Sequence, residues 1–212
     1  MSTKSPALAL AALNTMPPAG FAAALGDIFE HAPWVAEGAA AHRPFETVAE
    51  LHDAMLVVLA AAPPEAVAGF LNHHPDLAGP AARMPQLTAH SSDEQAGAGF
   101  DELTPEETSR LVRWNAEFRA RFGFPFIICV RRHTQASIFA EFARRFAGDP
   151  ETERRAALDE IARITALRLA ARVTGVGMPK VHGELSTHLL DTARGRPAAG
   201  GRRHGGAFCA RR

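Results

Sequence analysis

The chain has 212 residues, 47 % of them hydrophobic, and its 23 basic and 23 acidic side chains give a formal net charge of +0. This length predicts one domain followed by a tail, or one and a half domains, with enough apolar residues for a sizeable core. The neutral balance gives no support to binding of nucleic acid or of a membrane surface by the chain as a whole. The two cysteines, Cys129 and Cys209, lie in an apolar run and near the C-terminus, which argues against a disulfide framework. No apolar stretch reaches the roughly 18 residues that a membrane-spanning helix needs.

The N-terminal segment predicts a first helix rather than a secretion signal. Ser5 and Pro6 are residue types favoured at the N-cap and the first position of a helix, and an apolar run over 7–13 follows them. Only one basic residue, Lys4, precedes that run, and no convincing cleavage site follows it. We therefore expect a helix that begins at Ser5-Pro6, in a cytoplasmic protein.

Residues 5 to about 175 are expected to be almost entirely helical. Apolar side chains recur at the spacing of one helix face over 21–29 and again over 45–59. The fold class is therefore predicted to be all-α, with a single helical-bundle domain over 5–174. Glycine and proline then mark a linker at 175–182, and the tail that follows is expected to be largely irregular.

Two long helices carry clear start signals. Thr104 and Glu107 form a capping box with Pro105 at the first helical position, and Gly123 is expected to end that helix. Asp149-Pro150 has the same cap-then-proline pattern and opens the last long helix.

The segment 124–130 breaks the helical pattern. It is a continuous apolar run, Phe-Pro-Phe-Ile-Ile-Cys-Val, that follows a glycine and contains a proline. It is too short and too disturbed by proline for a core helix, so we predict a buried extended segment. The backbone N–H groups of such a segment need hydrogen-bond partners, and a ligand is one candidate.

Two polar clusters hold residue types suited to catalysis. His74 precedes a proline, which favours an extended backbone, and a loop histidine held in this way could act as a general base near neutral pH. It could equally be an exposed histidine at a helix end. Ser91 and Glu94 are three residues apart and would share a face of a helix. They could form an N-terminal capping box, and a capped helix N-terminus also binds anions.

Arg168 falls within the apolar stripe of the last helix, between Ile161 and Ile164 in projection. A cation on that stripe must be paired, must reach solvent along the core edge, or must serve a ligand. Arg154 and Arg172 lie close to the same stripe, so helical position alone does not select Arg168.

Metal and nucleotide cofactors receive little support. The possible metal ligands are His73, His74, Asp76, His90, Asp93 and Glu94. They fit no compact zinc motif, and the chain has no usable cysteine pair. No glycine-rich phosphate loop follows a predicted strand. A metal-dependent hydrolase that uses His74, His90 and Glu94 is kept as an alternative, which metal analysis of the protein would identify.

Several short motifs occur in a specific order between about residues 10 and 173. They are Leu13-Asn14; Phe29-Glu30-His31 with Pro33-Trp34-Val35-Ala36; Arg43-Pro44-Phe45; His74-Pro75-Asp76-Leu77-Ala78; Ser91 with Glu94-Gln95-Ala96-Gly97-Ala98-Gly99; and Phe122-Gly123-Phe124-Pro125-Phe126. In order and spacing, this part of the chain resembles the family of decarboxylases that act on 2-oxo-4-hydroxy-4-carboxy-5-ureidoimidazoline (OHCU).

The resemblance implies an all-α, usually homodimeric enzyme that needs no cofactor. Its reaction would convert OHCU to (S)-allantoin and CO₂ in urate degradation, with a functional link to urate oxidase and hydroxyisourate hydrolase. It implies His74 as the catalytic base and Glu94 as the second catalytic group. The substrate-binding residues that it implies are Pro75, Ser91, Gln95, Phe126, Ile127, Ile128 and Arg168. A non-catalytic binding module that keeps this fold is the alternative, disfavoured because these polar residues are present together.

A second resemblance lies in the tail. Residues 183–200 resemble the first strand of hydroxyisourate hydrolase, and His188 matches the first active-site histidine of that family. The match stops at Gly200 and the later motifs are absent, so we expect a truncated fragment without hydrolase activity. The basic residues 201–212 are expected to be disordered. Their four arginines are weak support for nucleic-acid binding, which would have to be salt-sensitive and lost without them.

Overall fold

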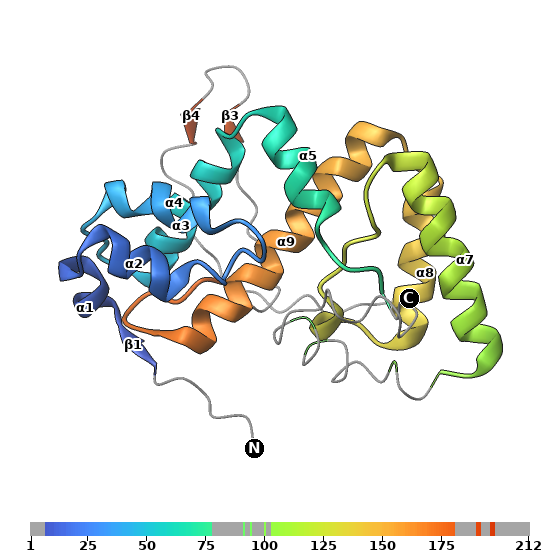
Figure 1. The fold of residues 1–212 in the computed structure, drawn as a ribbon, viewed down its shortest axis with the longest axis horizontal. Coiled ribbons are helices and arrows are strands. Elements are labelled where there is room, and N and C mark those ends of the chain that lie inside the picture. Colours follow the sequence, from blue (N-terminus) through green and yellow to red (C-terminus); the bar gives the residue numbers. More distant parts are fainter. Residues whose placement is uncertain are drawn as a thin grey trace. The chain divides into compact units, whose positions relative to one another are not determined.

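The computed structural model describes residues 7–77, 91, 94, 100 and 103–180, together with the backbone of 190–191 and 196–197. The chain divides into two compact units, residues 1–181 and 182–212. The first unit has the all-α architecture that the sequence predicts (Figure 1). Its helices are α1 (Leu10–Thr15), α2 (Pro18–Leu25), α3 (Pro33–Ala39), α4 (Val48–Ala60), α5 (Pro64–Asn72), α7 (Pro105–Phe122), α8 (Gln135–Phe146) and α9 (Pro150–Arg172), with short 3-10 helices at Ala40–His42 and Val130–Arg132.

Helix α9 is the longest helix in the described part of the chain, and it contacts helices from both halves of the first unit. It packs against α4 and against α7, and Figure 1 shows it running between the α1–α4 group and the α7–α8 pair. The Asp149 side chain caps it by accepting from the N–H groups of Glu151 and Thr152, with Pro150 at the first position as predicted. The same helix therefore forms part of the core on both sides.

Helix α7 begins and ends as predicted. The Thr104 hydroxyl accepts from the Glu107 N–H, and the Glu107 carboxylate accepts from the Thr104 N–H, which completes the capping box. Gly123 ends the helix in the left-handed conformation, with φ of 81°. Residues 124–129 then have no regular secondary structure and are buried throughout, which confirms that this apolar run is a buried, non-helical segment.

The first helix starts later than predicted. Ser5-Pro6 lies outside the described residues, Leu8–Ala9 forms strand β1, and α1 begins only at Leu10. Strand β1 pairs in parallel with β2 (Val173–Thr174), directly after α9. The prediction of a helix from Ser5-Pro6 is wrong because pairing with a distant strand overrides a local capping signal.

The residues after β2 hold the start of α4. The carbonyl groups of Val176 and Gly177 accept hydrogen bonds from the N–H groups of Val48 and Ala49 at 3.0 and 2.8 Å, two donors that a helix cannot satisfy itself. Gly177 has φ of 62°, and a Cβ there would lie 2.7 Å from Thr47 Cβ, so glycine is required on both grounds. The first residues of the predicted linker thus belong to the fold of the first unit.

In the second unit, the described residues form strand β3 (Leu190–Asp191), which pairs antiparallel with β4 (Arg196–Pro197). Most of the predicted fragment 183–200, including His188, lies outside the described residues, as does the predicted tail 201–212.

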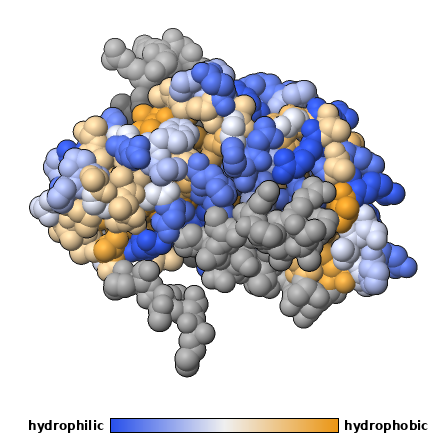
Figure 2. Space-filling model, viewed as in Figure 1, coloured by the Kyte–Doolittle hydropathy of each residue, from blue (hydrophilic) through white to orange (hydrophobic). Residues whose placement is uncertain are grey.

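The first unit has one main apolar core. Its largest fully buried aromatic side chains are Phe21, Phe29, Phe118, Phe126 and Phe142. On the face in Figure 2, hydrophilic and weakly apolar residues are interspersed, and the most hydrophobic ones form small separate spots. No single described helix is long and apolar enough to span a membrane; α4 and α5 reach that length only together, with a bend of 110° between them.

Candidate functional site

A pocket lies where α9, the loop after α5 and the segment 126–130 meet. Its lining residues are Glu30, His74, Pro75, Leu77, Ser91, Glu94, Phe126, Ile127, Ile128, Val130, Ile164 and Arg168. Every site residue expected from the sequence and described by the structure is among them. Gln95 lies outside the described residues.

Arg168 is the centre of a buried ion-pair network. Its Nε and Nη2 donate to the two carboxylate oxygens of Glu94 at 2.9 and 2.8 Å, a bidentate pair. Nη2 also donates to Glu30 Oε2 at 3.2 Å, and the Ser91 hydroxyl donates to that same oxygen at 2.5 Å. Burial alone lowers the pKa of Arg168, but the bonds and charges of Glu94 and Glu30 outweigh it and raise that pKa. The guanidinium is therefore a permanent positive charge inside the pocket.

The structure separates Arg168 from the other two arginines near the same stripe of α9. Arg154 pairs with Glu151 at the surface, and Arg172 pairs with Asp27. The side chains of Arg154 and Arg172 are 47 % and 19 % exposed, against 5 % for Arg168. Of the three, Arg168 alone lines the pocket.

His74 presents a neutral imidazole to the pocket. Its Nδ1 lies 3.0 Å from the carbonyl oxygen of Phe70, so we assign the proton to Nδ1, which donates, and a free lone pair to Nε2. Burial lowers the pKa of His74 to about 4, against the raising effects of the Phe70 bond and the Glu30 charge. An unprotonated imidazole at pH 7 is the form that a general base requires.

Helix α7 holds the loop that carries His74. Arg119 donates through Nη2 to the His74 carbonyl at 3.3 Å and through Nε to the Asp76 carboxylate at 2.7 Å. Asn115 donates to the Leu77 carbonyl at 2.8 Å. The backbone is thus fixed on both sides of Pro75, which restricts the position of the imidazole.

Glu30 lines the pocket, and although it belongs to the Phe29-Glu30-His31 motif, the sequence alone assigns it no role in the site. It lies between α2 and α3, next to the buried residues Ile28 and Phe29, and is itself only 3 % exposed. Its position directly after the apolar residues Ile28 and Phe29 is only a weak signal in the sequence, and its burial in the structure is the stronger one, because a buried charge needs a partner. Here that partner is Arg168.

No group of three or more His, Cys, Asp or Glu side chains in the described part of the chain is arranged to hold a metal ion. Of the six possible ligands, His73 is exposed, and its Nδ1 lies 2.6 Å from the Gly69 carbonyl oxygen. His90 and Asp93 lie outside the described residues.

Comparison with known proteins gives a consistent match. The family model described as OHCU decarboxylase matches residues 14–170. The 2-oxo-4-hydroxy-4-carboxy-5-ureidoimidazoline decarboxylase of Haloferax volcanii is 39 % identical over 165 residues, which cover 78 % of this chain and 96 % of that protein. The Mus musculus protein of the same name is 38 % identical over 157 residues, covering 74 % of this chain and 88 % of that protein.

Two further matches extend this comparison. The uric acid degradation bifunctional protein PucL of Bacillus subtilis is 36 % identical over 165 residues, 78 % of this chain and 33 % of that protein. The crystal structure of an (S)-allantoin synthase is similar with a TM-score of 0.65 and 28 % identity, over 80 % of this chain and 54 % of that chain.

Replacement of Arg168 by Met should lower the free energy of unfolding by about 3–5 kcal/mol, because it leaves Glu30 and Glu94 without their buried cation. Arg172→Met is the matched control on the same helix. Its partner Asp27 is 48 % exposed, so we expect a loss below about 1 kcal/mol. Urea unfolding at pH 7 measures both variants. Equal losses would contradict the buried network around Arg168.

Proposed function

The chain belongs to the OHCU decarboxylase family, and we propose that the pocket around Arg168 is where it removes CO₂ from OHCU to form (S)-allantoin. The activity of a decarboxylase in urate degradation follows from the family and from these relatives. The observation that supports this pocket as the site is the convergence of His74, Glu94 and Arg168 on one buried space from distant parts of the chain.

The substrate determines what the protein has to do. In OHCU one ring carbon carries both a hydroxyl and a carboxylate, and the neighbouring carbon carries the ureido group. When CO₂ leaves, the electron pair of the broken carbon–carbon bond enters the ring and is taken up by the adjacent imine or carbonyl. The ring nitrogen that takes up this pair gains a proton, the hydroxyl loses its proton, and the ureido-bearing carbon gains one, so the carboxylate form of the substrate takes up one proton in all from water. The substrate is its own electron sink, so we propose a cofactor-free reaction in which the protein orients the ring and moves protons.

In this proposal His74 is the general base. Its free Nε2 lone pair takes the proton of the substrate hydroxyl, and the low pKa keeps that nitrogen unprotonated at pH 7. Glu94 is the second catalytic group. Its carboxylate, oriented by two bonds from Arg168, accepts hydrogen bonds from the ureido N–H groups beside the carbon that receives a proton.

Arg168 acts in this proposal through the two carboxylates rather than as a clamp for the substrate carboxylate. A clamp would stabilise the ground state and slow the loss of CO₂. The donors Nε and Nη2 of Arg168 are already bonded to Glu94 and Glu30. Two carboxylates beside one guanidinium give the described lining an excess of negative charge, which disfavours the substrate carboxylate relative to neutral CO₂.

The other expected residues complete the proposed site. Ser91 and Gln95 bind polar groups of the substrate, while Pro75 and the backbone of 126–128 form the walls. We further propose a homodimer in the cytoplasm and a functional link to hydroxyisourate hydrolase and urate oxidase. The similarity to bifunctional uric acid degradation proteins from Bacillus subtilis and Bacillus sp. supports that link.

Replacing His74 or Glu94 by Ala should lower kcat by about 10²-fold or more, the usual scale for a general acid–base group. His73→Ala is the matched control, since this neighbouring imidazole is exposed and lies outside the pocket lining. Consumption of OHCU, generated in place from urate by urate oxidase and hydroxyisourate hydrolase, measures the rates. Turnover close to wild type in either Ala variant would remove that residue from the catalytic role.

The low pKa of His74 predicts an unusual pH profile. Because the unprotonated imidazole is the active form, kcat/KM should hold through pH 6.5 and fall only as the pH decreases through about 4. Spontaneous decay of OHCU is subtracted at each pH. Circular dichroism checks folding, because burial also lowers the pKa of His52 in the core to about 4. A fall centred near pH 6.5 in folded protein would argue against His74 as the base.

A further inference from the structure

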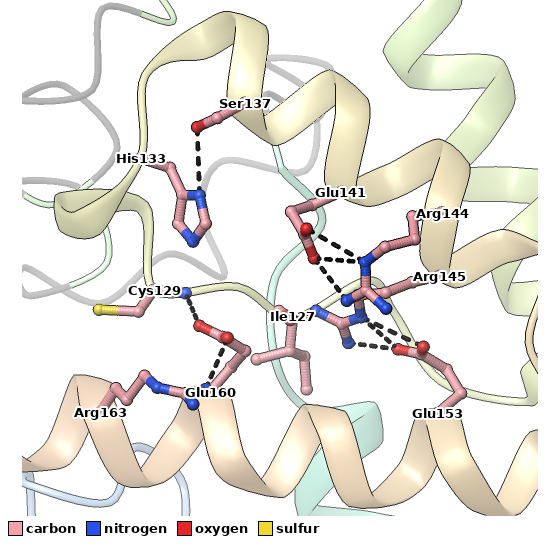
Figure 3. Close-up of polar contacts among 10 residues, drawn as sticks. All are labelled: Ile127, Cys129, His133, Ser137, Glu141, Arg144, Arg145, Glu153, Glu160 and Arg163. Atoms are coloured by element: carbon pink, nitrogen blue, oxygen red, sulfur yellow. Dashed lines mark hydrogen bonds and ion pairs between the residues drawn. The ribbon is translucent and has the colours of Figure 1, made fainter. Parts of the chain in front are cut away.

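A second buried ion pair lies behind one wall of the pocket. Arg145 of α8 donates through Nε to both carboxylate oxygens of Glu153 on α9, at 2.9 and 3.1 Å, and its Nη2 bonds the same carboxylate. The two side chains are only 3 % and 2 % exposed. Neither residue lines the pocket. Figure 3 shows the pair beside the segment that carries Ile127 and Cys129.

Side chains of α8 and α9 hold the backbone of this wall at two points. Arg145 Nη1 donates to the Ile127 carbonyl at 2.7 Å, and its guanidinium lies 4.5 Å from the centre of the Phe126 ring. Glu160 accepts from the Cys129 N–H at 2.9 Å. The dashed contacts in Figure 3 trace the Glu160 bond and the Arg145–Glu153 pair.

These contacts set the orientation of the peptide between Ile127 and Ile128. The peptide is trans, so its C=O and N–H point in opposite directions. Because the Ile127 carbonyl points to Arg145, the Ile128 N–H points away from it. Both isoleucines line the pocket, whereas Arg145 does not. No group in the described part of the chain accepts a hydrogen bond from the Ile128 N–H.

We propose that Arg145, Glu153 and Glu160 are positioning residues that aim the Ile128 N–H at the substrate, where it donates to the ring atom that gains charge as CO₂ leaves. This inference rests on the proposed function. A cation bonded to the carbonyl of a peptide also polarises its N–H, which strengthens the donor. Main-chain donors fixed in advance stabilise developing negative charge without reorganisation. Glu153 fixes the guanidinium, which could not remain buried without a partner.

The first variant replaces the pair by apolar residues, Arg145→Met with Glu153→Leu, because removing both partners leaves no uncompensated buried charge. The matched control, called the exposed pair, is Arg144→Met with Glu141→Leu. These two residues are of the same types, lie together on α8 and are more exposed, at 66 % and 32 %. We expect kcat/KM to fall at least about 10-fold in the buried-pair variant. In the control it should change less than about twofold. Thermal unfolding shows whether each variant is folded.

A spectroscopic readout distinguishes positioning from a general loss of structure. Ile127-Ile128 is the only pair of consecutive isoleucines in the sequence. Protein labelled with isoleucine that carries carbonyl ¹³C and amide ¹⁵N therefore gives one carbonyl–amide NMR correlation, from this peptide. Adding (S)-allantoin, the stable product, should shift that signal in the wild type and in the exposed-pair control. It should leave the signal unshifted in the buried-pair variant.

Equal responses to (S)-allantoin in the two double variants would overturn the inference. The inference would also be overturned if the wild type decarboxylates OHCU but its Ile127–Ile128 signal does not shift when (S)-allantoin is added. In that case the proposed function would still stand. Absence of decarboxylation by the wild type would overturn the proposed function and this inference with it. If the buried-pair variant fails to fold, Glu160→Ala decides: a weakened product response supports the positioning role, and an unchanged response and rate contradict it.

Discussion

The buried guanidinium of Arg168 must have carboxylate partners, and this requirement brings remote parts of the chain together. Glu30 comes from the segment between α2 and α3, Glu94 from a separate stretch, and Arg168 from α9. An unpaired charge at this depth would cost several kcal/mol, so the ion pairs constrain three segments at once. The pocket forms where they meet. Removal from water in this pocket also lowers the pKa of His74, and its imidazole therefore stays neutral at pH 7.

Helix α9 supplies both the charged centre and the support of the adjacent wall. Glu153, Glu160, Ile164 and Arg168 recur at the spacing of one helix face. The first two hold Arg145 and the Cys129 N–H, and the last two line the pocket. A displacement of α9 would therefore move the ion-pair network and the wall together. One helix thus carries charged side chains that support the fold and others that line the pocket.

The parts of the fold that depend on neighbouring residues follow from the sequence, and the parts that depend on distant contacts do not. The capping box of α7 and the buried run 124–129 are local patterns, and both predictions are confirmed. Helix α1 starts later than the local capping signal predicts, because β1 pairs with β2 from the far end of the first unit. In helical projection Arg168 resembles Arg154 and Arg172, so without the family resemblance only its burial distinguishes it. Glu30 needed the three-dimensional contact with Arg168 to be recognised.

Allantoin has its stereocentre at the carbon that receives the proton, so the optical activity of the product tests the central claim most directly. OHCU also decays without enzyme to racemic allantoin, and circular dichroism distinguishes that background from a product formed in a chiral pocket. With OHCU generated in place from urate, the wild-type protein should cause (S)-allantoin to appear rapidly and in excess. Slow formation of racemic allantoin in the presence of folded protein would contradict catalysis by this pocket.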